Sequence, residues 1–482
     1  MQSGCVAMDE RGGQGMKRRF RRFTRVLGER PVLTSFAVAL VVRLITAAAI
    51  NLFHEGVLIP DEGQYLTLAL AASQGGLTAD FWLGYGQSLF DSTRTFMWPL
   101  TTLFWLFGPS RLLAQLLPVL FGSVTAATTA AVAGRVVRRS YALTAGLIVA
   151  LFPSQVLWSS VVLRESLVWA GLAGIAALVS YSNRKSSTIK ILSSTVVSSL
   201  LIVALASLRI QTAALALWCL FLALLIGRGS RVVRVLSAVC FLLVVPWQLG
   251  MGPGAVTFAQ GSVDRLGSAH AYMSLNADSS VLTDSSVLTD SSLDDGDVAF
   301  TKGSVDSCAA HVKGKTGEWK GITEGGGKLL ERESGAWLCI SDESGGTVLV
   351  DNRPWTSLRR VPKGLLDTMI RPLPWKAGWS NPDRFAAGLE LPFWILLYVF
   401  SAYGAWEQRE HFRQLIFPAL LFGSVAVSGA MVHGNLGTAF RHRGQVLFAV
   451  AILAVGGLQA VADRRKGRQR RRDTIDSVNP EI

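Results

Sequence analysis

The chain contains 482 residues with a formal net charge of +14, and 50% of its residues are hydrophobic while only 17% are charged. Its mean hydropathy of +0.37 is higher than a soluble core requires, so the composition indicates a membrane protein. The basic residues occur in short runs between apolar segments and at both ends, and no base-reading motif accompanies them. The positive charge therefore indicates membrane anchoring and argues against a nucleic-acid partner.

A basic stretch precedes the first apolar segment. The run within residues 1–30 consists of Lys17, Arg18, Arg19, Arg21, Arg22 and Arg25. Residues 31–53 are long enough to cross a bilayer of about 30 Å at about 1.5 Å per residue, whereas the apolar part of a signal peptide has only roughly 7 to 15 residues. We therefore predict a cytoplasmic N-terminus followed by an uncleaved helix that runs from inside to outside.

Further basic runs orient the remaining apolar segments, because cytoplasmic loops are enriched in Lys and Arg. Placing each run inside predicts about ten membrane helices, at residues 31–53, 110–134, 140–157, 165–182, 191–208, 211–227, 235–252, 385–406, 415–433 and 444–462. The expected fold is an α-helical polytopic membrane protein, with membrane modules at 31–252 and 385–462 and a basic cytoplasmic tail at 463–482. The apolar stretch from Met97 to Phe107 is too short to cross, so we expect a re-entrant or juxtamembrane helix there.

The long segment 253–384 falls on the outer side in this topology and differs sharply in composition. It contains a Ser- and Asp-rich stretch, 278–295, in which the sequence DSSVLT occurs twice, and such polar repeats are typical of flexible chain. Residues 337–341 and 347–351 are β-prone runs around a turn containing glycine, which predicts a hairpin in a small β-containing extracytoplasmic insertion. Cys308 and Cys339 also lie in this segment, and the sequence leaves their pairing open.

An acidic pair lies in the first outer loop, residues 54–96. Pro60 precedes Asp61 and Glu62, and a proline here is typical of the start of a helix, whose first turn favours acidic residues. One interpretation is therefore a helix cap. The other is that one carboxylate acts as a general base while its neighbour orients the group that loses the proton. Ionisable groups at a membrane boundary are costly to desolvate, which favours a functional role.

A second acidic residue, Glu165, follows an outer turn that contains Pro153 and is directly preceded by Arg164. Glu165 either forms a local ion pair with Arg164 that caps a helix, or lies across a cavity from Asp61 and helps to hold a reacting group.

Basic residues on the outer side are candidates for holding a phosphate, because guanidinium groups form bidentate, charge-assisted bonds to phosphate oxygens. Arg209 lies at a short outer turn. Arg441, His442 and Arg443 lie on a predicted outer loop that nearby glycines make irregular. Anchoring to lipid head groups is the competing interpretation. Arg43, within the first span, is expected to snorkel or to pair internally.

These features together resemble the multi-span GT-C glycosyltransferases, which include the protein mannosyltransferase and aminoarabinose transferase types. The resemblance covers roughly the first half of the chain and is carried by an outer loop that opens with Asp61-Glu62 and continues to Tyr65, by the stretch Phe107-Gly108-Pro109-Ser110-Arg111 before a helix that ends in basic residues, and by the Pro153 turn leading to Glu165. Residues 434–443 are similar to the outer basic turn that some members have before their last helix. The resemblance implies that Asp61 is the base, with Glu62 beside it.

The resemblance further implies an inverting transfer of a sugar from a polyprenyl phosphate or diphosphate to a glycan, lipid or protein acceptor. The reaction is expected at the cell membrane, on the extracytoplasmic side. The expected catalytic residues are Asp61, Glu62 and Glu165, and the expected substrate-binding residues are Tyr65, Arg209, Arg441, His442 and Arg443.

Two other functions stay open. A polysaccharide polymerase or O-antigen ligase also faces outward and handles lipid diphosphates with arginines, so it would depend on Arg209, Arg441 and His442 rather than on Asp61. A flippase or transporter of lipid-linked sugars would place charges along a path through the bilayer, where the sequence has few besides Arg43.

Several cofactor motifs are absent from the sequence. There is no GxxxxGK[ST] loop, no HExxH and no paired CxxC, so ATP hydrolysis and zinc catalysis lack their usual ligands. We expect no dedicated cofactor, with a divalent Mg²⁺ or Mn²⁺ ion between Asp61 and Glu62 as the open alternative.

Overall fold

A computed structural model describes most of the two predicted membrane modules and parts of the segment between them. The described residues are 29–54, 56–75, 85–184, 187–248, 299–301, 319–324, 327–332, 337–341, 347–351, 362, 365–366, 368–370, 388–432 and 436–478. The contacts between residues divide the chain into two compact units. The first, here called the helical unit, comprises Met1–Phe241, Pro392–Phe422 and Gly444–Ile482, and the second comprises Leu242–Leu391 and Gly423–Arg443.

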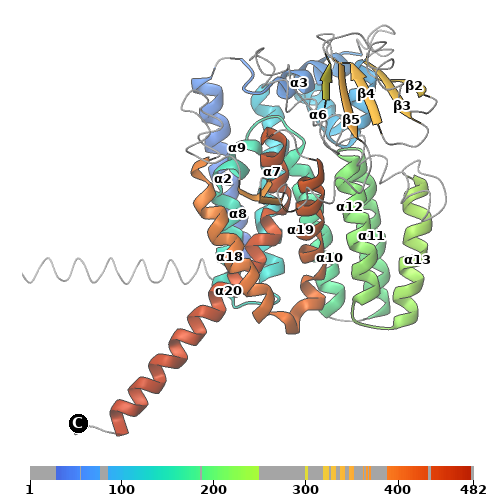
Figure 1. Ribbon diagram of the computed structural model, residues 1–482. Coiled ribbons are helices and arrows are strands. Elements are labelled where there is room, and N and C mark those ends of the chain that lie inside the picture. Colours follow the sequence, from blue (N-terminus) through green and yellow to red (C-terminus); the bar gives the residue numbers. More distant parts are fainter. Residues whose placement is uncertain are drawn as a thin grey trace, which may run out of the picture. The chain divides into compact units, whose positions relative to one another are not determined.

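Long apolar helices dominate the described part of the chain (Figure 1). The first half contains α2 (Pro31–Phe53), α3 (Pro60–Ser73), α5 (Tyr85–Ser92), α6 (Arg94–Phe107), α7 (Arg111–Ala133), α8 (Arg139–Leu151), α9 (Pro153–Trp158), α10 (Glu165–Arg184), α11 (Thr188–Ala206), α12 (Ile210–Ile226) and α13 (Arg231–Gln248). The second half contains α18 (Leu391–Glu407), the short 3-10 helix η1 (Arg409–His411), α19 (Phe412–Val432) and α20 (Leu436–Val478).

Six helical stretches among the described residues are long and apolar enough to cross a membrane. They are Pro31–Phe53, Arg111–Ala133, Glu165–Asn183, Thr188–Ala206, Arg409–Ala430 and Arg443–Gln469, while Arg139–Leu151 and Ile210–Ile226 are shorter apolar helices. Leu33, Ile45 and Leu200 expose more than half of their surface, as expected for side chains that face lipid. The chain is therefore a helical membrane protein, and the total of ten spans stays a prediction.

The helical unit is built around α7, which packs against α2, α8 and α10. Small residues on α7 face these neighbours, and Ser123, Ala126 and Ala130 are fully buried. Gly146 on α8 has Ser35 of α2 so close that an added Cβ atom would lie 2.1 Å from the Ser35 hydroxyl oxygen. Small side chains let membrane helices approach closely, so that packing rather than hydrophobic exclusion holds them together.

The predicted span 140–157 is broken in the structure. Helix α8 ends at Leu151, and Pro153 begins the separate short helix α9. Proline has no amide hydrogen and its ring clashes with the preceding turn, so a continuous helix through this position is disfavoured. After α9, residues 159–164 form an irregular connection, which leads into α10 at Glu165.

Helix α6 covers the Met97–Phe107 stretch that was expected to form a short helix. Phe96, Leu100 and Phe104 are buried, and α6 packs against α3 and α7. Trp98 and Trp105 point outward with 61% and 71% of their surfaces exposed. Fourteen residues are too few to cross a bilayer, and exposed tryptophans are typical of a helix at the membrane interface.

Helix α20 is much longer than the predicted span 444–462. It extends over 43 residues, so the residues at 436–443 are helical rather than part of an outer loop. Its middle part packs closely on α18, where an added Cβ atom at Gly404 would lie 2.0 Å from the Leu453 carbonyl oxygen. At its basic end, Arg464 pairs with Glu407 at 2.5 Å and Asp463 pairs with Arg138.

The second unit contains a five-stranded antiparallel sheet. Its strands are β1 (Ala299–Thr301), β2 (Trp319–Glu324), β3 (Gly327–Arg332), β4 (Trp337–Ser341) and β5 (Thr347–Asp351), in the order β1-β5-β4-β3-β2. The predicted hairpin corresponds to β4 and β5, which pair from Trp337 with Asp351 to Ser341 with Thr347. The DSSVLT repeats and Cys308 lie outside the described residues. Whether Cys308 pairs with Cys339 therefore stays open.

Candidate functional site

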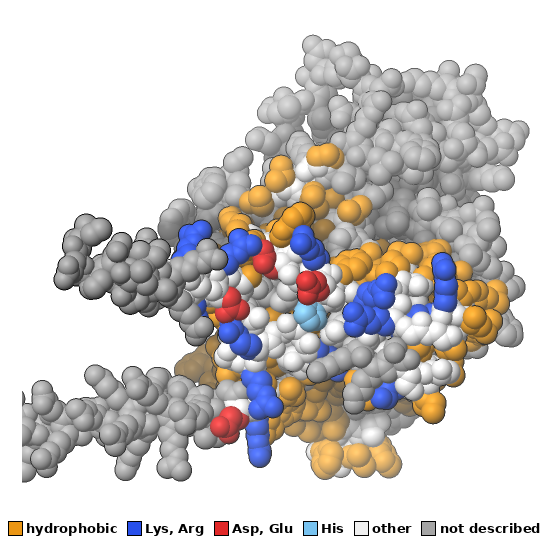
Figure 2. All heavy atoms as spheres, turned by 90° about the horizontal axis from the view of Figure 1, so that it is seen from below, with side chains coloured by type: hydrophobic (Ala, Val, Ile, Leu, Met, Phe, Trp, Pro, Cys, Tyr) orange, Lys and Arg blue, Asp and Glu red, His pale blue; other side chains and the backbone are white. Residues whose placement is uncertain are grey.

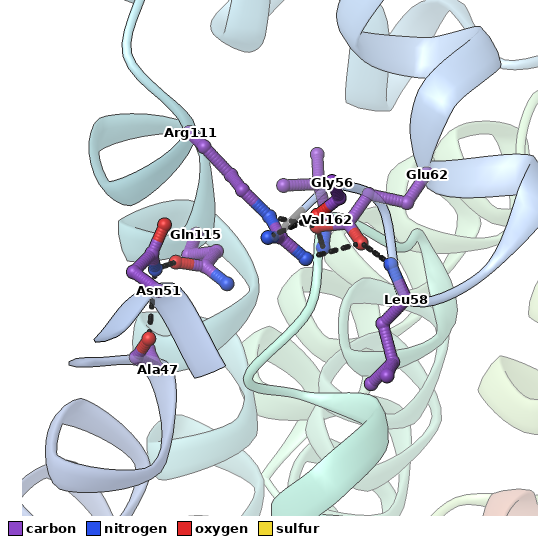
Figure 3. A network of polar contacts seen from close by, with 8 residues as sticks. All are labelled: Ala47, Asn51, Gly56, Leu58, Glu62, Arg111, Gln115 and Val162. Carbon is purple, nitrogen blue, oxygen red and sulfur yellow. Dashed lines mark hydrogen bonds and ion pairs between the residues drawn. The ribbon is translucent and has the colours of Figure 1, made fainter. Parts of the chain in front are cut away.

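Glu62 is fully buried and lies in a polar network at the start of α3 (Figure 3). Its carboxylate accepts two parallel bonds from the Arg111 guanidinium, at 3.0 Å from Nε and 2.9 Å from Nη2. It also accepts from the backbone N–H of Leu58 at 3.1 Å and of Val162 at 3.4 Å. Arg111 in turn donates to the Gly56 carbonyl oxygen. Glu62 therefore joins the first loop, the start of α7 and the connection before α10.

This network shows what Glu62 does in the fold. The bidentate pair with Arg111 and the two backbone donors occupy both carboxylate oxygens of Glu62. A carboxylate held by charge-assisted bonds on both oxygens is fixed in position and has little room for a further hydrogen-bond partner. The sequence predicts that one of the two adjacent acids is the base and that the other orients the reacting group. The geometry of Glu62 matches the orienting role. Arg111 was not predicted as a site residue.

Asp61 occupies the same first turn of α3 and has a different environment. Pro60 is the first residue of the helix, and both acids lie at its positively polarised N-terminal end. The Asp61 side chain is partly exposed, whereas that of Glu62 is fully buried. Adjacent residues in a helix point in directions about 100° apart, which explains how one acid reaches Arg111 while the other does not.

Tyr65 lies one turn after Asp61 and is 4% exposed. Its ring packs edge to face on Phe96 of α6, with the ring centres 5.3 Å apart. Burial raises the pKa of Tyr65 to about 12, with opposing electrostatic effects from two arginines, Arg164 and Arg209, and two acids, Glu165 and Asp61. The Tyr65 hydroxyl therefore stays protonated at neutral pH and is surrounded by charges from three segments of the chain.

Glu165 pairs with Arg209 and not with its neighbour Arg164. The Arg209 Nη2 atom lies 2.5 Å from Glu165 Oε1, and the side chains are 14% and 4% exposed. Glu165 is the first residue of α10 and Arg209 is the N-cap residue of α12, so the pair joins the starts of two helices. The local Arg164–Glu165 ion pair is thus not observed, and the positive charge of Arg209 is balanced by Glu165.

Arg164 differs from the other arginines of this region. It is partly exposed, its buried Nε atom has no hydrogen-bond partner, and among the described residues no carboxylate forms an ion pair with it. Its charge nevertheless acts on the Tyr65 hydroxyl. Arg164 is therefore a cation near Tyr65 that forms no ion pair with any described residue. The sequence did not single it out as a binding residue.

Arg43 holds the connection that leads to Glu165. It is fully buried in α2, as expected for internal pairing, and donates to the Ser159 hydroxyl oxygen at 2.6 Å and to the carbonyl oxygens of Ala150 at 2.9 Å and Val149 at 3.2 Å. These carbonyls belong to the last turn of α8, which the proline break leaves without helical partners. Gly122 makes room for this arrangement, because an added Cβ atom there would lie 2.7 Å from Arg43 Nε.

The predicted outer triplet lies in the first turns of α20. Arg441 and His442 are helical, and the structure does not describe their side chains. Arg443 is 3% exposed and donates to the Met369 carbonyl oxygen at 3.2 Å within the second unit. The prediction of an irregular surface loop at these residues is therefore wrong. Gln445, slightly further along α20, accepts a bond of 3.1 Å from Thr212 of α12.

Chemically, the residues of the first loop and the α9–α10 connection form one group, here called the first-loop cluster. It consists of Asp61, Glu62, Tyr65, Arg111, Arg164, Glu165 and Arg209. The described residues contain no group of three or more His, Cys, Asp or Glu arranged to hold a metal ion. Comparison of the chain with models of known protein families and with curated proteins finds no match.

Proposed function

We propose that this protein is a membrane glycosyltransferase that moves a sugar from a polyprenyl-phosphate-linked donor to an extracytoplasmic acceptor. The observation that supports it most is the surrounding of Tyr65. Two acids and two arginines from α3, the α9–α10 connection and the start of α12 act on one buried hydroxyl group. A buried hydroxyl group with a raised pKa and charged residues around it is typical of functional sites, and the resemblance of the first loop to GT-C enzymes supplies the reaction class.

The proposed reaction breaks the bond between the sugar C1 atom and the phosphate oxygen of the donor. An acceptor hydroxyl attacks C1 from the opposite face while a base removes its proton. The electron pair of the broken bond leaves with the lipid phosphate, which gains one negative charge. A base on one side of the sugar and a cation near the leaving phosphate are therefore the two groups that the site has to provide.

Asp61 is the proposed base. Its side chain is partly exposed and lies in the same helical turn as Glu62, whose bonds to Arg111 and to two backbone donors fix that turn. Glu62 thus serves as the positioning neighbour. A carboxylate is the group that accepts the proton in this reaction, and Asp61 places one in the first turn of α3.

Arg164 is the proposed cation for the departing phosphate. Arg209 is already engaged with Glu165 at 2.5 Å. Arg443 belongs to the second unit and donates to a backbone oxygen of that unit. Arg164 lies within electrostatic reach of Tyr65 and has no carboxylate partner among the described residues. The protonated Tyr65 hydroxyl is a further hydrogen-bond donor for the substrate, and the Glu165–Arg209 pair holds the walls of the site together.

The test compares envelope glycans and lipid-linked sugars by mass spectrometry in cells that lack the protein. These cells are complemented with wild type, Asp61→Asn or Asp91→Asn at equal expression. Asp91 provides the control, because it is an exposed acid of α5 in the same loop. We expect wild type and Asp91→Asn to restore one missing glycan, whereas Asp61→Asn accumulates the lipid-linked donor.

The same experiment separates the alternatives. Full restoration by Asp61→Asn contradicts the proposed base and favours a polymerase or ligase that depends on arginines. Loss of the lipid-linked sugar from one membrane leaflet, with no change in transfer chemistry, favours a flippase. Arg164→Gln is expected to reduce product formation strongly and Arg164→Lys to restore part of it, since a lysine supplies charge without the bidentate geometry.

A further inference from the structure

A second polar cluster lies at the other end of α10. Asn183, near the end of that helix, is fully buried and accepts bonds from the Arg228 backbone N–H at 3.1 Å and from Arg234 Nη2 at 2.7 Å. Its amide group also donates to the Arg413 carbonyl oxygen. One asparagine thereby joins the end of α10, the α12–α13 connection and the start of α19. The residues concerned are here called the Asn183 cluster: Asn183, Arg228, Arg231, Arg234 and Arg413.

Arg234 is the buried arginine of this cluster. It is 2% exposed and donates to the carbonyl oxygens of Arg228 and, at 3.3 Å, of Leu224, which are left without helical partners where α12 ends. Gly227 is required here, because an added Cβ atom would lie 1.8 Å from Arg234 Nη1. The cluster is therefore an assembled structure and not a chance gathering of surface side chains.

The other three arginines of the cluster are exposed. Arg228 precedes α13, Arg231 begins it, and Arg413 lies in the first turn of α19. The Arg413 charge acts on Arg234, and the Arg228 backbone bonds both Asn183 and Arg234. The ion pairs found between described residues involve other arginines and none of this cluster. Figure 2 views the protein from below and shows Lys and Arg side chains spread over this side, with Asp, Glu and His side chains among them.

We propose that the Asn183 cluster binds a phosphate group, held by the Arg228, Arg231 and Arg413 side chains above the buried Arg234. Guanidinium groups suit phosphate because their fork matches two of its oxygens. The start of α13 adds backbone N–H donors at the same place. Because the cluster lies where membrane-spanning helices end, an anionic phospholipid head group is the expected source of that phosphate.

The test uses the full-length protein in detergent and a triple variant, Arg228→Gln/Arg231→Gln/Arg413→Gln. Asn183 bonds only to backbone groups of Arg228 and Arg413, so these substitutions keep the contacts that assemble the cluster. The matched control is Arg465→Gln/Lys466→Gln/Arg468→Gln, which removes the same charge from exposed residues of α20. Arg231→Gln alone serves as a milder variant if the triple variant does not fold.

Native mass spectrometry then measures the retention of phosphatidylglycerol against phosphatidylcholine after a high-salt wash, which weakens exposed contacts more than assembled ones. We expect wild type and control to retain phosphatidylglycerol, and the preference for phosphatidylglycerol over phosphatidylcholine to fall about fivefold for each cluster arginine removed.

A parallel arm adds inorganic phosphate to delipidated protein and follows the melting temperature. A rise in wild type that the triple variant lacks, without a lipid preference, identifies free phosphate as the source. Equal retention and equal melting shifts in wild type and triple variant, or an equal loss in the control, would overturn the proposal.

Discussion

The buried charged groups at the two ends of α10 have different kinds of partner. At its start, the first-loop cluster pairs buried carboxylates with arginines, as in Glu62–Arg111 and Glu165–Arg209. At its end, the buried Arg234 is bonded by an amide oxygen and two backbone carbonyls. The first arrangement balances charge and fixes side chains for chemistry, while the second leaves positive charge that an outside anion can balance. Breaking individual members of each cluster tests this difference.

The largest effect is expected from Glu62→Gln. This change neutralises the fully buried member of a bidentate pair and leaves the largely buried Arg111 without its charged partner, which typically costs about 3–5 kcal/mol. Thermal unfolding in detergent measures the loss. The double variant Glu62→Gln/Arg111→Gln should recover part of it, because no buried charge is then left unpaired. Equal melting temperatures for wild type and Glu62→Gln would show that the pair does not stabilise the loop.

A smaller loss is expected from Glu165→Gln, about 2–3 kcal/mol, because Arg209 bonds one carboxylate oxygen of Glu165, whereas Arg111 bonds both oxygens of Glu62. Unfolding measurements should place this variant between wild type and Glu62→Gln. An effect larger than that of Glu62→Gln would contradict the ranking by bidentate geometry.

The Asn183 cluster should respond differently to a new acid. Asn183→Leu removes the acceptor of Arg228 and Arg234 and is expected to cost about 2 kcal/mol. Asn183→Asp keeps that acceptor and adds a charge partner for Arg234, so it should be more stable than Asn183→Leu despite losing the bond to the Arg413 carbonyl. The melting temperatures of Asn183→Leu and Asn183→Asp measure this difference in stability. Equal melting temperatures would mean that the cluster's positive charge does not destabilise the fold. Asn183→Asp should also weaken phosphate binding.

The smallest effect appears only at alkaline pH. The pKa of Tyr65 is raised to about 12 from an ordinary value of 10.0, so the unfolded chain loses this proton first. Stability from Tyr65 is therefore complete below about pH 10 and is lost as the pH rises to 12, by about 1 kcal/mol at pH 11. The difference in unfolding free energy between wild type and Tyr65→Phe, followed from pH 9 to 11, should show this decline. A difference that does not change with pH would place Tyr65 in an ordinary aqueous environment.

Local features of the chain could be predicted from sequence, while partners across the fold could not. The helix start at Pro60 with two acids in its first turn, the β4–β5 hairpin and the short α6 all follow from residue order. Arg111 was missed as the partner of Glu62 because 49 positions separate them. One of the two interpretations paired Glu165 with Arg164, but the partner of Glu165 is Arg209 at the start of α12, 44 positions away.

Two predictions were wrong because the effect of a proline was underestimated and that of glycines was overestimated. Pro153 was placed inside a span that it interrupts, because hydrophobicity alone continues through residue 157. The glycines at 434 and 437 were interpreted as a loop, whereas α20 already begins at Leu436. A single glycine costs a helix only about 1 kcal/mol, and the long apolar stretch that follows outweighs that cost.

The most direct test of the proposed site compares the two adjacent acids. Asp61→Asn and Glu62→Gln are each measured for melting temperature in detergent and for restoration of the missing glycan in cells. The account predicts that Asp61→Asn restores no glycan and that Glu62→Gln melts several degrees below Asp61→Asn, because only Glu62 is held by the buried bidentate bond to Arg111. Restoration of the glycan by Asp61→Asn at wild-type expression would contradict the assignment of Asp61 as the base.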